Sequence, residues 1–204
     1  MKQIIKNALI LTAITLIAGV LLGLVYEVTK GPIAASKERA KKEAYQKVLP
    51  DAKEFSNLVF DVDIVSKAIK DAGITGCTIN EVVIAKTGKE AIGYIVTAKS
   101  SEGYGGDIVV SVGILNDGTI NGVAILSISE TVGLGMNASK PEFYEQFTGK
   151  KVKEFVVTKT GAKEETEVDA ISGATITSNA MTDAVNAALA YFNQVCVIGG
   201  GVNE

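Results

Sequence analysis

The chain has 204 residues, of which 47% are hydrophobic and 21% charged, with a formal net charge of −3, two cysteines and no histidine or tryptophan. Without histidine it has no Ser-His-Asp or Cys-His catalytic machinery, no histidine-ligated zinc and no imidazole proton shuttle. Cys77 and Cys196 are too few for a four-thiolate zinc or iron–sulfur site, and they lack C-x-x-C spacing. Any redox chemistry therefore requires an imported organic cofactor.

The first element in chain order is an apolar segment, Asn7 to Tyr26, which contains no charged residue. Its twenty residues reach roughly 30 Å as a helix, about one hydrocarbon thickness. A cleaved signal peptide usually has a shorter apolar region that ends in a small-x-small site. Here the next small residues lie beyond the charged Glu27 and Lys30. We therefore expect a short N-terminal segment over 1–6, a retained transmembrane helix over 7–26, and membrane lipid as a partner.

The residues that flank this segment leave its orientation open. Two lysines precede it and five basic residues follow it before position 43, so the count of positive charges does not place the following domain outside the cell. Gly19 and Gly23 have the G-x-x-x-G spacing of closely packed membrane helices, although two ordinary glycines explain it equally well. The chain after Tyr26 is net acidic, which argues against nucleic acid as a partner.

Downstream of the apolar segment the pattern predicts a stalk and then strands. Ser36 to Val48 is typical of a charged helix with Ser36 as its N-cap, and Pro50 follows its end. A stalk helix is therefore expected over 27–50. Apolar residues then alternate with a period of two over 81–96 and 107–126, which predicts two β-hairpins of one twisted antiparallel sheet.

The C-terminal part completes the predicted domain. Val152 to Thr158 indicates a further strand, and a last helix is expected to begin near Ser178. Its apolar residues from Met181 to Phe192 recur at helical spacing and predict one stripe that packs on the sheet. We expect an α+β fold, in which a single transmembrane helix precedes a twisted antiparallel sheet packed on helices. The domain extends over 51–195, and a flexible tail over 196–204 follows it.

Three loops rich in glycine, serine and threonine are candidates for a functional site: 103–106, 129–137 and 169–178. None has the G-x-G-x-x-G or Walker pattern of a nucleotide-binding fold. The third loop brings hydroxyls and small residues to the start of the last helix, where unpaired N–H groups and the helix dipole suit a phosphate. A simple helix cap by one of its Ser or Thr side chains explains the same residues.

Two of these loops carry a resemblance to a known family. Asp169-x-x-Ser172-Gly173-Ala174-Thr175 resembles the flavinylation signature of the FMN-binding domain family. The segment from Glu130 to Gly135, E-T-V-G-L-G, resembles the family's E-T-P-G-L-G segment, with Val132 in place of proline. Residues 103–106 and 48–52 resemble two further family segments. The chain is most similar to the RnfG subunits of the Rnf ion-translocating electron-transport complexes, ahead of the related NqrC subunits of the sodium-translocating NADH:quinone reductases.

The resemblance implies a covalent FMN, linked by a phosphoester to Thr175 and installed by a flavin transferase, in an FMN-binding domain over 51–195. It implies an electron carrier between ferredoxin and NAD, coupled to Na⁺ or H⁺ movement, with the domain on the extracytoplasmic side and the other membrane and peripheral Rnf subunits as partners. The flavin performs the redox chemistry, so no catalytic side chain and no metal site are expected. The residues expected around the flavin are Ser172, Gly173, Ala174, Thr177, Glu130, Thr131, Gly133, Leu134, Gly135, Met136 and Tyr104.

Several alternatives stay open at this point. Asp169 is either recognised by the transferase or satisfies local N–H groups, and Glu130 either orients the flavin or is a solvated loop residue. Cys77 and Cys196 form a disulfide, share a cluster with a partner, or are free or buried thiols, the last being our expectation. A cofactor-free, membrane-anchored scaffold domain is a competing function. So is a free-standing flavin reductase, although the sequence shows no dinucleotide fingerprint.

Overall fold

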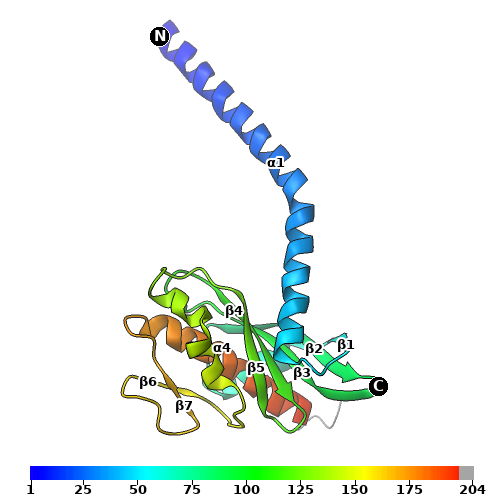
Figure 1. The fold of residues 1–204 in the computed structure, drawn as a ribbon. Helices are drawn as coiled ribbons and strands as arrows, with labels where there is room; N and C mark the ends of the chain where they lie inside the picture. Colours follow the sequence, from blue (N-terminus) through cyan, green and yellow to red (C-terminus); the bar gives the residue numbers. More distant parts are fainter. Residues whose placement is uncertain (198–204) are drawn as a thin grey trace. The chain divides into compact units, whose positions relative to one another are not determined.

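The computed structural model describes residues 1–197 and divides into two compact units, Met1–Lys42 and the chain from Glu43 onward (Figure 1). The first unit consists of α1 (Lys2–Val48), whose last residues belong to the second unit. An 18-residue window of α1 has a mean hydropathy of 2.7 and none of it is buried. This helix is long and apolar enough to cross a membrane, as expected from the sequence.

The helix differs from the expectation in having no break before the stalk. Ser36 lies inside α1, so its predicted role as an N-cap is wrong. The residues around it are mostly alanine, lysine and glutamate, which are strong helix formers, and extending an existing helix costs less than nucleating a new one. The boundaries at 7–26 and 27–50 between a transmembrane and a stalk part stay predictions.

The second unit is built on a five-stranded antiparallel sheet in which the strands follow each other in chain order. Both predicted hairpins are confirmed, the first by the pairing of β2 with β3 and the second by that of β4 with β5. The edge strand β1 and the helix α2 (Val62–Asp71) lie in a stretch for which the sequence predicted no element. The strands are β1 (Glu54–Leu58), β2 (Cys77–Thr87), β3 (Glu90–Ser100), β4 (Ile108–Leu115) and β5 (Ile120–Ser127).

The chain after β5 is mostly irregular until the last long helix. The predicted strand over 152–158 is only three residues long and pairs in parallel with one other short strand, in a separate two-stranded sheet. The long helix α4 begins at Thr175, three residues before the predicted start. Part of the predicted tail, 198–204, lies outside the described residues. The elements are η1 (Gly135–Ser139), α3 (Pro141–Tyr144), η2 (Glu145–Phe147), β6 (Val156–Thr158), β7 (Glu167–Asp169), α4 (Thr175–Tyr191) and η3 (Phe192–Val197).

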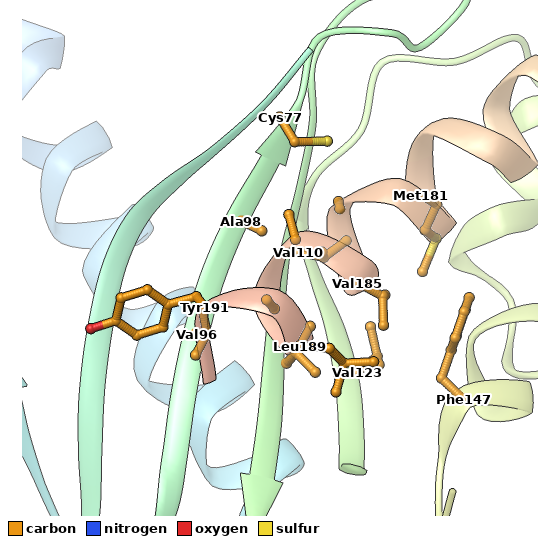
Figure 2. Packing of buried hydrophobic residues seen from close by; sticks show 14 of the residues in the cluster. Cys77, Val96, Ala98, Val110, Val123, Phe147, Met181, Val185, Leu189 and Tyr191 are labelled. Atoms are coloured by element: carbon orange, nitrogen blue, oxygen red, sulfur yellow. The ribbon is translucent and has the colours of Figure 1, made fainter. Parts of the chain in front are cut away.

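The main core lies between α4 and one face of the sheet. Met181, Val185 and Leu189 of α4 are fully buried and belong to one cluster with Val123 and Phe147 (Figure 2). The predicted apolar stripe is therefore confirmed, and with it the α+β fold class. The opposite side of α4 is buried as well, because the segment before β6 covers it. There Asn186 accepts a hydrogen bond from the Phe155 N–H at 2.8 Å and donates one to its carbonyl at 2.9 Å.

A smaller core covers the other face of the sheet. Here the last turn of α1 packs on residues that alternate with those facing α4. Gly113 and Gly122 are paired across β4 and β5, and a Cβ at Gly113 would lie 2.7 Å from the Val48 carbonyl oxygen. Asn121 donates a hydrogen bond to the same oxygen at 2.8 Å. Two glycines thus leave the space that the end of α1 occupies.

Cys77 is a free, buried thiol at the start of β2. Burial raises the pKa of this thiol to about 11, and the carboxylates of Asp183 and Glu102 add to the rise, while a hydrogen bond with Ser100 opposes it. The side chain of Cys196 lies outside the described part of the chain. The expectation of a free, buried thiol therefore holds for Cys77.

The raised pKa predicts that Cys77 is inert toward alkylation in the folded chain. At about pH 8 the thiol stays protonated, because its pKa is about 11, whereas an unfolded cysteine has a pKa near 8.5 and is partly thiolate. Alkylation of Cys77 by iodoacetamide should be about 100-fold slower in the native chain than in the denatured chain. Peptide mass spectrometry measures both rates, and equal rates would contradict the buried, protonated thiol.

Candidate functional site

A cavity of about 590 Å³ lies where α4 begins, and all three loops singled out in the sequence contribute to its wall. One loop follows β3, the second follows β5 and the third leads into α4. The volume falls in the range of small-molecule and cofactor sites. The residues that line it are Tyr104, Glu130, Thr131, Leu134, Gly135, Gly173, Ala174, Thr175, Ile176 and Thr177.

The first turn of α4 presents unsatisfied N–H groups at this cavity. Ala174 is the N-cap residue, and no side chain caps the helix. The first N–H groups of an α-helix have no partner within the helix, and the positive end of the dipole of α4 lies at the same place. An arrangement of this kind is suited to an anion such as a phosphate. The alternative that a Ser or Thr of this loop merely caps the helix is not what the structure shows.

The turn before α4 is held by a serine that sequence reasoning did not single out. Ser178 Oγ accepts a hydrogen bond from the Ile171 N–H at 2.9 Å and donates one to the Ala174 carbonyl at 2.9 Å. Gly173, with a φ of +74°, allows the chain to turn between them. The position of Ser178, seven residues after Ile171 and four after Ala174, is the sequence signal that would have identified it. The loop therefore presents Thr175 at the wall of the cavity from a fixed backbone.

Glu130 is the buried acidic group of the cavity wall. Only 8% of this residue is exposed, and neither carboxylate oxygen has a hydrogen-bond partner in the described residues. A Cβ at Gly103 would lie 2.8 Å from Oε1, and one at Gly135 would lie 2.8 Å from Oε2 and 2.6 Å from Thr177 Oγ1. Glycine is required at both positions because any larger residue would meet the carboxylate. Glu130 is therefore not a solvated loop residue.

The apolar part of the wall is exposed at the rim. Tyr104, Leu134 and Ile176 have exposed side chains there. Leu134 reaches the third loop, because its Cδ2 lies 3.2 Å from the position of a Cβ on Gly173. Ile176 is the lining residue that sequence reasoning missed. An exposed isoleucine in the first turn of a helix that otherwise buries its apolar residues is the signal that would have found it.

Three of the residues expected around the flavin do not line this cavity. Ser172 and Gly133 are exposed in the turns on either side of it, and Met136 is half-buried in η1. The backbone N–H groups of Leu134 and Met136 both donate to the Thr131 carbonyl at 3.1 Å. The second loop therefore turns back on itself after Thr131, and of its residues the cavity is lined by Glu130, Thr131, Leu134 and Gly135.

Asp169 lies at the end of β7, in the wall of a separate cavity of about 340 Å³. Its carboxylate accepts a hydrogen bond from the Ala162 N–H at 2.6 Å. Its own N–H donates to Gln146 Oε1 at 2.7 Å. The structure thus gives Asp169 the local role that sequence reasoning held open, which is to satisfy a backbone N–H group of the preceding loop.

Two family models match the chain. One describes an FMN-binding domain and matches residues 103–190, and the other describes the RnfG N-terminal region and matches residues 1–48. The first match includes all three loops of the cavity. The second contains all of α1.

Curated relatives match along nearly the whole chain. The G subunit of the Na⁺-translocating ferredoxin:NAD⁺ oxidoreductase complex of Acetobacterium woodii is 36% identical, covering 95% of this chain and 94% of the relative. The G subunit of the proton-translocating ferredoxin:NAD⁺ oxidoreductase complex of Clostridium ljungdahlii is 33% identical, covering 94% and 91%. Among solved structures, the C subunit of the Na⁺-translocating NADH-quinone reductase from Parabacteroides distasonis has a TM-score of 0.51 and 26% identity, covering 70% of this chain and 77% of that one.

The fold and the site define a protein with an FMN-binding domain behind an N-terminal apolar helix. More narrowly, the chain belongs to the RnfG family, the G subunits of the ion-translocating oxidoreductase complexes.

The role of Ser178 predicts a stability difference between two hydroxyls of α4. Replacing Ser178 by Ala leaves the part-buried Ile171 N–H without an acceptor, which costs about 1–3 kcal/mol. Thr182 is the matched control, because its buried hydroxyl has no hydrogen-bond partner in the described chain, so Thr182→Val should change stability little. Guanidinium unfolding of the detergent-solubilised chain, followed by circular dichroism, measures both. Equal stability of Ser178→Ala and the wild type would contradict the role of this serine in holding the turn.

Proposed function

We propose that this chain is the FMN-carrying electron-transfer component of a membrane-bound, ion-translocating ferredoxin:NAD oxidoreductase complex of the Rnf type. Its relatives are named as components of such complexes, and an FMN-binding domain model matches the part of the chain that contains the cavity. The observation that carries the proposal is the uncapped N-terminus of α4, which opens on this cavity and places Thr175 in its wall.

The residues of the cavity fit a flavin attached through its phosphate. We propose that Thr175 Oγ1 carries FMN as a phosphoester, which leaves one negative charge at the first turn of α4. The N–H groups of that turn stabilise this charge through hydrogen bonds and the helix dipole. The lining includes no lysine or arginine among the described residues, so the stabilisation falls to these backbone groups. Because the attachment is covalent, the chain keeps its cofactor whatever the concentration of free FMN.

The remaining lining residues supply a polar and an apolar side for the flavin. The hydroxyls of Thr131 and Thr177 offer hydrogen bonds, and Tyr104, Leu134 and Ile176 offer apolar contact at the rim. Gly173, Ala174 and Gly135 allow the cofactor to approach the backbone. We keep Ser172, Gly133 and Met136 in the proposed site as residues of the supporting loops, with no contact to the flavin assigned to them.

Bound FMN supplies the redox chemistry, and the protein positions it and sets its electrostatic surroundings. An electron carrier needs no general acid or base, which agrees with a chain that has no histidine. The chain's own contribution is to hold the cofactor at a cavity whose rim remains exposed, where a redox partner can come close to it. The competing hypothesis of a cofactor-free scaffold gives no reason for an uncapped helix beside a buried carboxylate.

We further propose that α1 anchors the chain as a single membrane span, in contact with lipid and with the other membrane and peripheral subunits of the complex. The domain then lies on the extracytoplasmic side, as the resemblance to this family implies. A single span whose apolar segment has no charged residue provides no ion pathway. The neighbouring subunits therefore carry the coupling ion, and this chain carries electrons.

We propose that a flavin transferase installs the FMN and reads Asp169 while it modifies Thr175. The structural role of the Asp169 carboxylate does not oppose this, because Asp169 is exposed and lies in the wall of an open cavity. A transferase can therefore contact Asp169 in the folded domain. The proposal assigns Asp169 no part in electron transfer.

The covalent linkage predicts a defined change in mass. When the full chain is co-expressed with a flavin transferase, its intact mass should increase by one FMN less one water. Thr175→Val should abolish the increase because it removes the acceptor oxygen. Thr177→Val is the matched control, since it changes a second threonine of the same wall and should keep the modification. An unmodified wild-type chain, or a modified Thr175→Val chain, would contradict the proposal.

A further inference from the structure

The positive charge of this chain is concentrated on one short stretch of α1. Residues 28–42 include five basic residues and one acidic residue, whereas the chain from Glu43 to its end has 13 basic and 21 acidic residues. The apolar segment 7–26 that precedes this stretch has no charged residue. We call residues 28–42 the basic segment, and its cations are Lys30, Lys37, Arg39, Lys41 and Lys42.

The side chains of these cations are displayed to solvent rather than used in packing. Four of the five are exposed and Lys41 is half-buried. Two of them pair with a glutamate three residues earlier on the helix surface, and exposed ion pairs of this kind contribute little. Within the described chain Lys37, Arg39 and Lys42 form no ion pair. The basic segment therefore has charge available for an external partner.

The position of the basic segment along α1 places its first cations at the surface of a bilayer. When the segment 7–26 fills the hydrocarbon layer, Lys30 lies about 6 Å beyond Tyr26 along the helix axis. The headgroup layer on each side is roughly 5–8 Å thick, so Lys30 lies at the level of the lipid phosphates. Lys37 lies about 16 Å beyond Tyr26, and its long side chain can reach back toward the headgroups.

A bend in α1 favours the approach of the following cations to the membrane. Figure 1 shows that α1 is bent, and Pro32 is a proline inside the helix. Proline kinks a helix because it removes a backbone hydrogen bond and its ring meets the preceding turn. The bend allows the residues after Pro32 to incline toward the membrane surface. Lys37 and Arg39 then lie within about one Debye length, 8–10 Å, of the headgroups.

We propose that the basic segment binds the phosphate groups of anionic phospholipids at the membrane surface. The inference rests on the proposed anchoring by α1 and deepens it, because it names the class of lipid that surrounds the end of the span. Lys and Arg donate charge-assisted hydrogen bonds to phosphate oxygens, and an anionic surface attracts each basic residue near it. The acidic domain is repelled by the same surface. The role also accounts for positive charge after the span, which the flanking charges left without an orientation to explain it.

The test measures the lipid preference of the full, flavin-free chain in vesicles. The chain has no tryptophan, so Tyr26→Trp, present in every variant, adds a single fluorescent reporter at the end of the apolar segment. Phospholipids with brominated acyl chains quench this fluorescence when they lie next to the helix. Quenching by brominated phosphatidylglycerol, which is anionic, and by brominated phosphatidylcholine, which is zwitterionic, gives the ratio of the two affinities.

The chain with its natural basic segment should bind phosphatidylglycerol about 5-fold more tightly than phosphatidylcholine, the effect of one basic residue near an anionic surface. Replacing Lys30, Lys37 and Arg39 together by Gln should abolish this preference. Circular dichroism should show the same helix content, because glutamine is also a good helix former. An equal affinity for both lipids in the natural segment, or a preference that survives the triple replacement, would overturn the proposal.

The matched control replaces Lys67, Lys70 and Lys89 by Gln. These lysines are exposed in the domain, and their replacement changes the net charge by the same amount. The control variant should keep the preference for phosphatidylglycerol. A loss equal to that of the first variant would show that the net charge of the chain, and not the basic segment, selects the lipid, and would overturn the proposal.

Two additions separate the lipid from other sources of the same chemistry. Raising the salt concentration from about 0.1 M to 1 M shortens the Debye length from about 10 Å to about 3 Å and should reduce the preference, and a preference that salt leaves unchanged would contradict attraction by charge. Inorganic phosphate added at constant ionic strength should not compete, and competition would show a site for free anions instead. Carbonate extraction reports on the span separately. A chain that carbonate removes contradicts the anchor itself, whereas a retained chain without lipid preference contradicts only this inference.

Discussion

The packing of α4 on the five-stranded sheet is the interaction on which the rest of the domain depends. α4 is buried along most of its length, on the sheet side by Met181, Val185 and Leu189 and on the other side by the segment that Asn186 binds. A helix held in a close-packed core cannot shift without opening cavities. Its first turn is therefore fixed against the loops that follow β3 and β5, and the candidate site forms where these meet.

The site is the part of the domain in which polar groups are left unsatisfied. The start of α4 has no side-chain cap, and the Glu130 carboxylate has no partner in the described chain. Proteins usually satisfy such groups, and exceptions concentrate at functional sites. The close packing of α4 offsets the loss of stability at these two groups. The hydrogen bonds of Ser178 hold the turn before α4 in place. Stability elsewhere in the domain thus maintains a locally unfavourable arrangement at the candidate site.

The other face of the same sheet holds the last turn of α1. The end of α1 lies in the space that Gly113 and Gly122 leave open, and Asn121 binds the last carbonyl of its helix. Tyr45 of the same turn donates a hydrogen bond to Glu81 on β2 at 2.9 Å. The last turn of α1, which belongs to the second unit, is therefore fixed to the strands that, on their opposite face, hold α4. Neither glycine would have been identified from the sequence, because each is needed only for a contact between distant segments.

The sequence by itself determined the local features of this protein: the apolar segment 7–26, the two hairpins, the amphipathic stripe of α4 and the motif that ends in Thr175. Each depends on residues that are neighbours in the chain, so periodicity and spacing reveal it. Only the tertiary structure decided which loop residues share one cavity, that Ile176 joins them while Met136 does not, and that Glu130 is buried without a partner in the described chain. Burial and hydrogen bonding are set by contacts between segments far apart in sequence, and no local pattern records them.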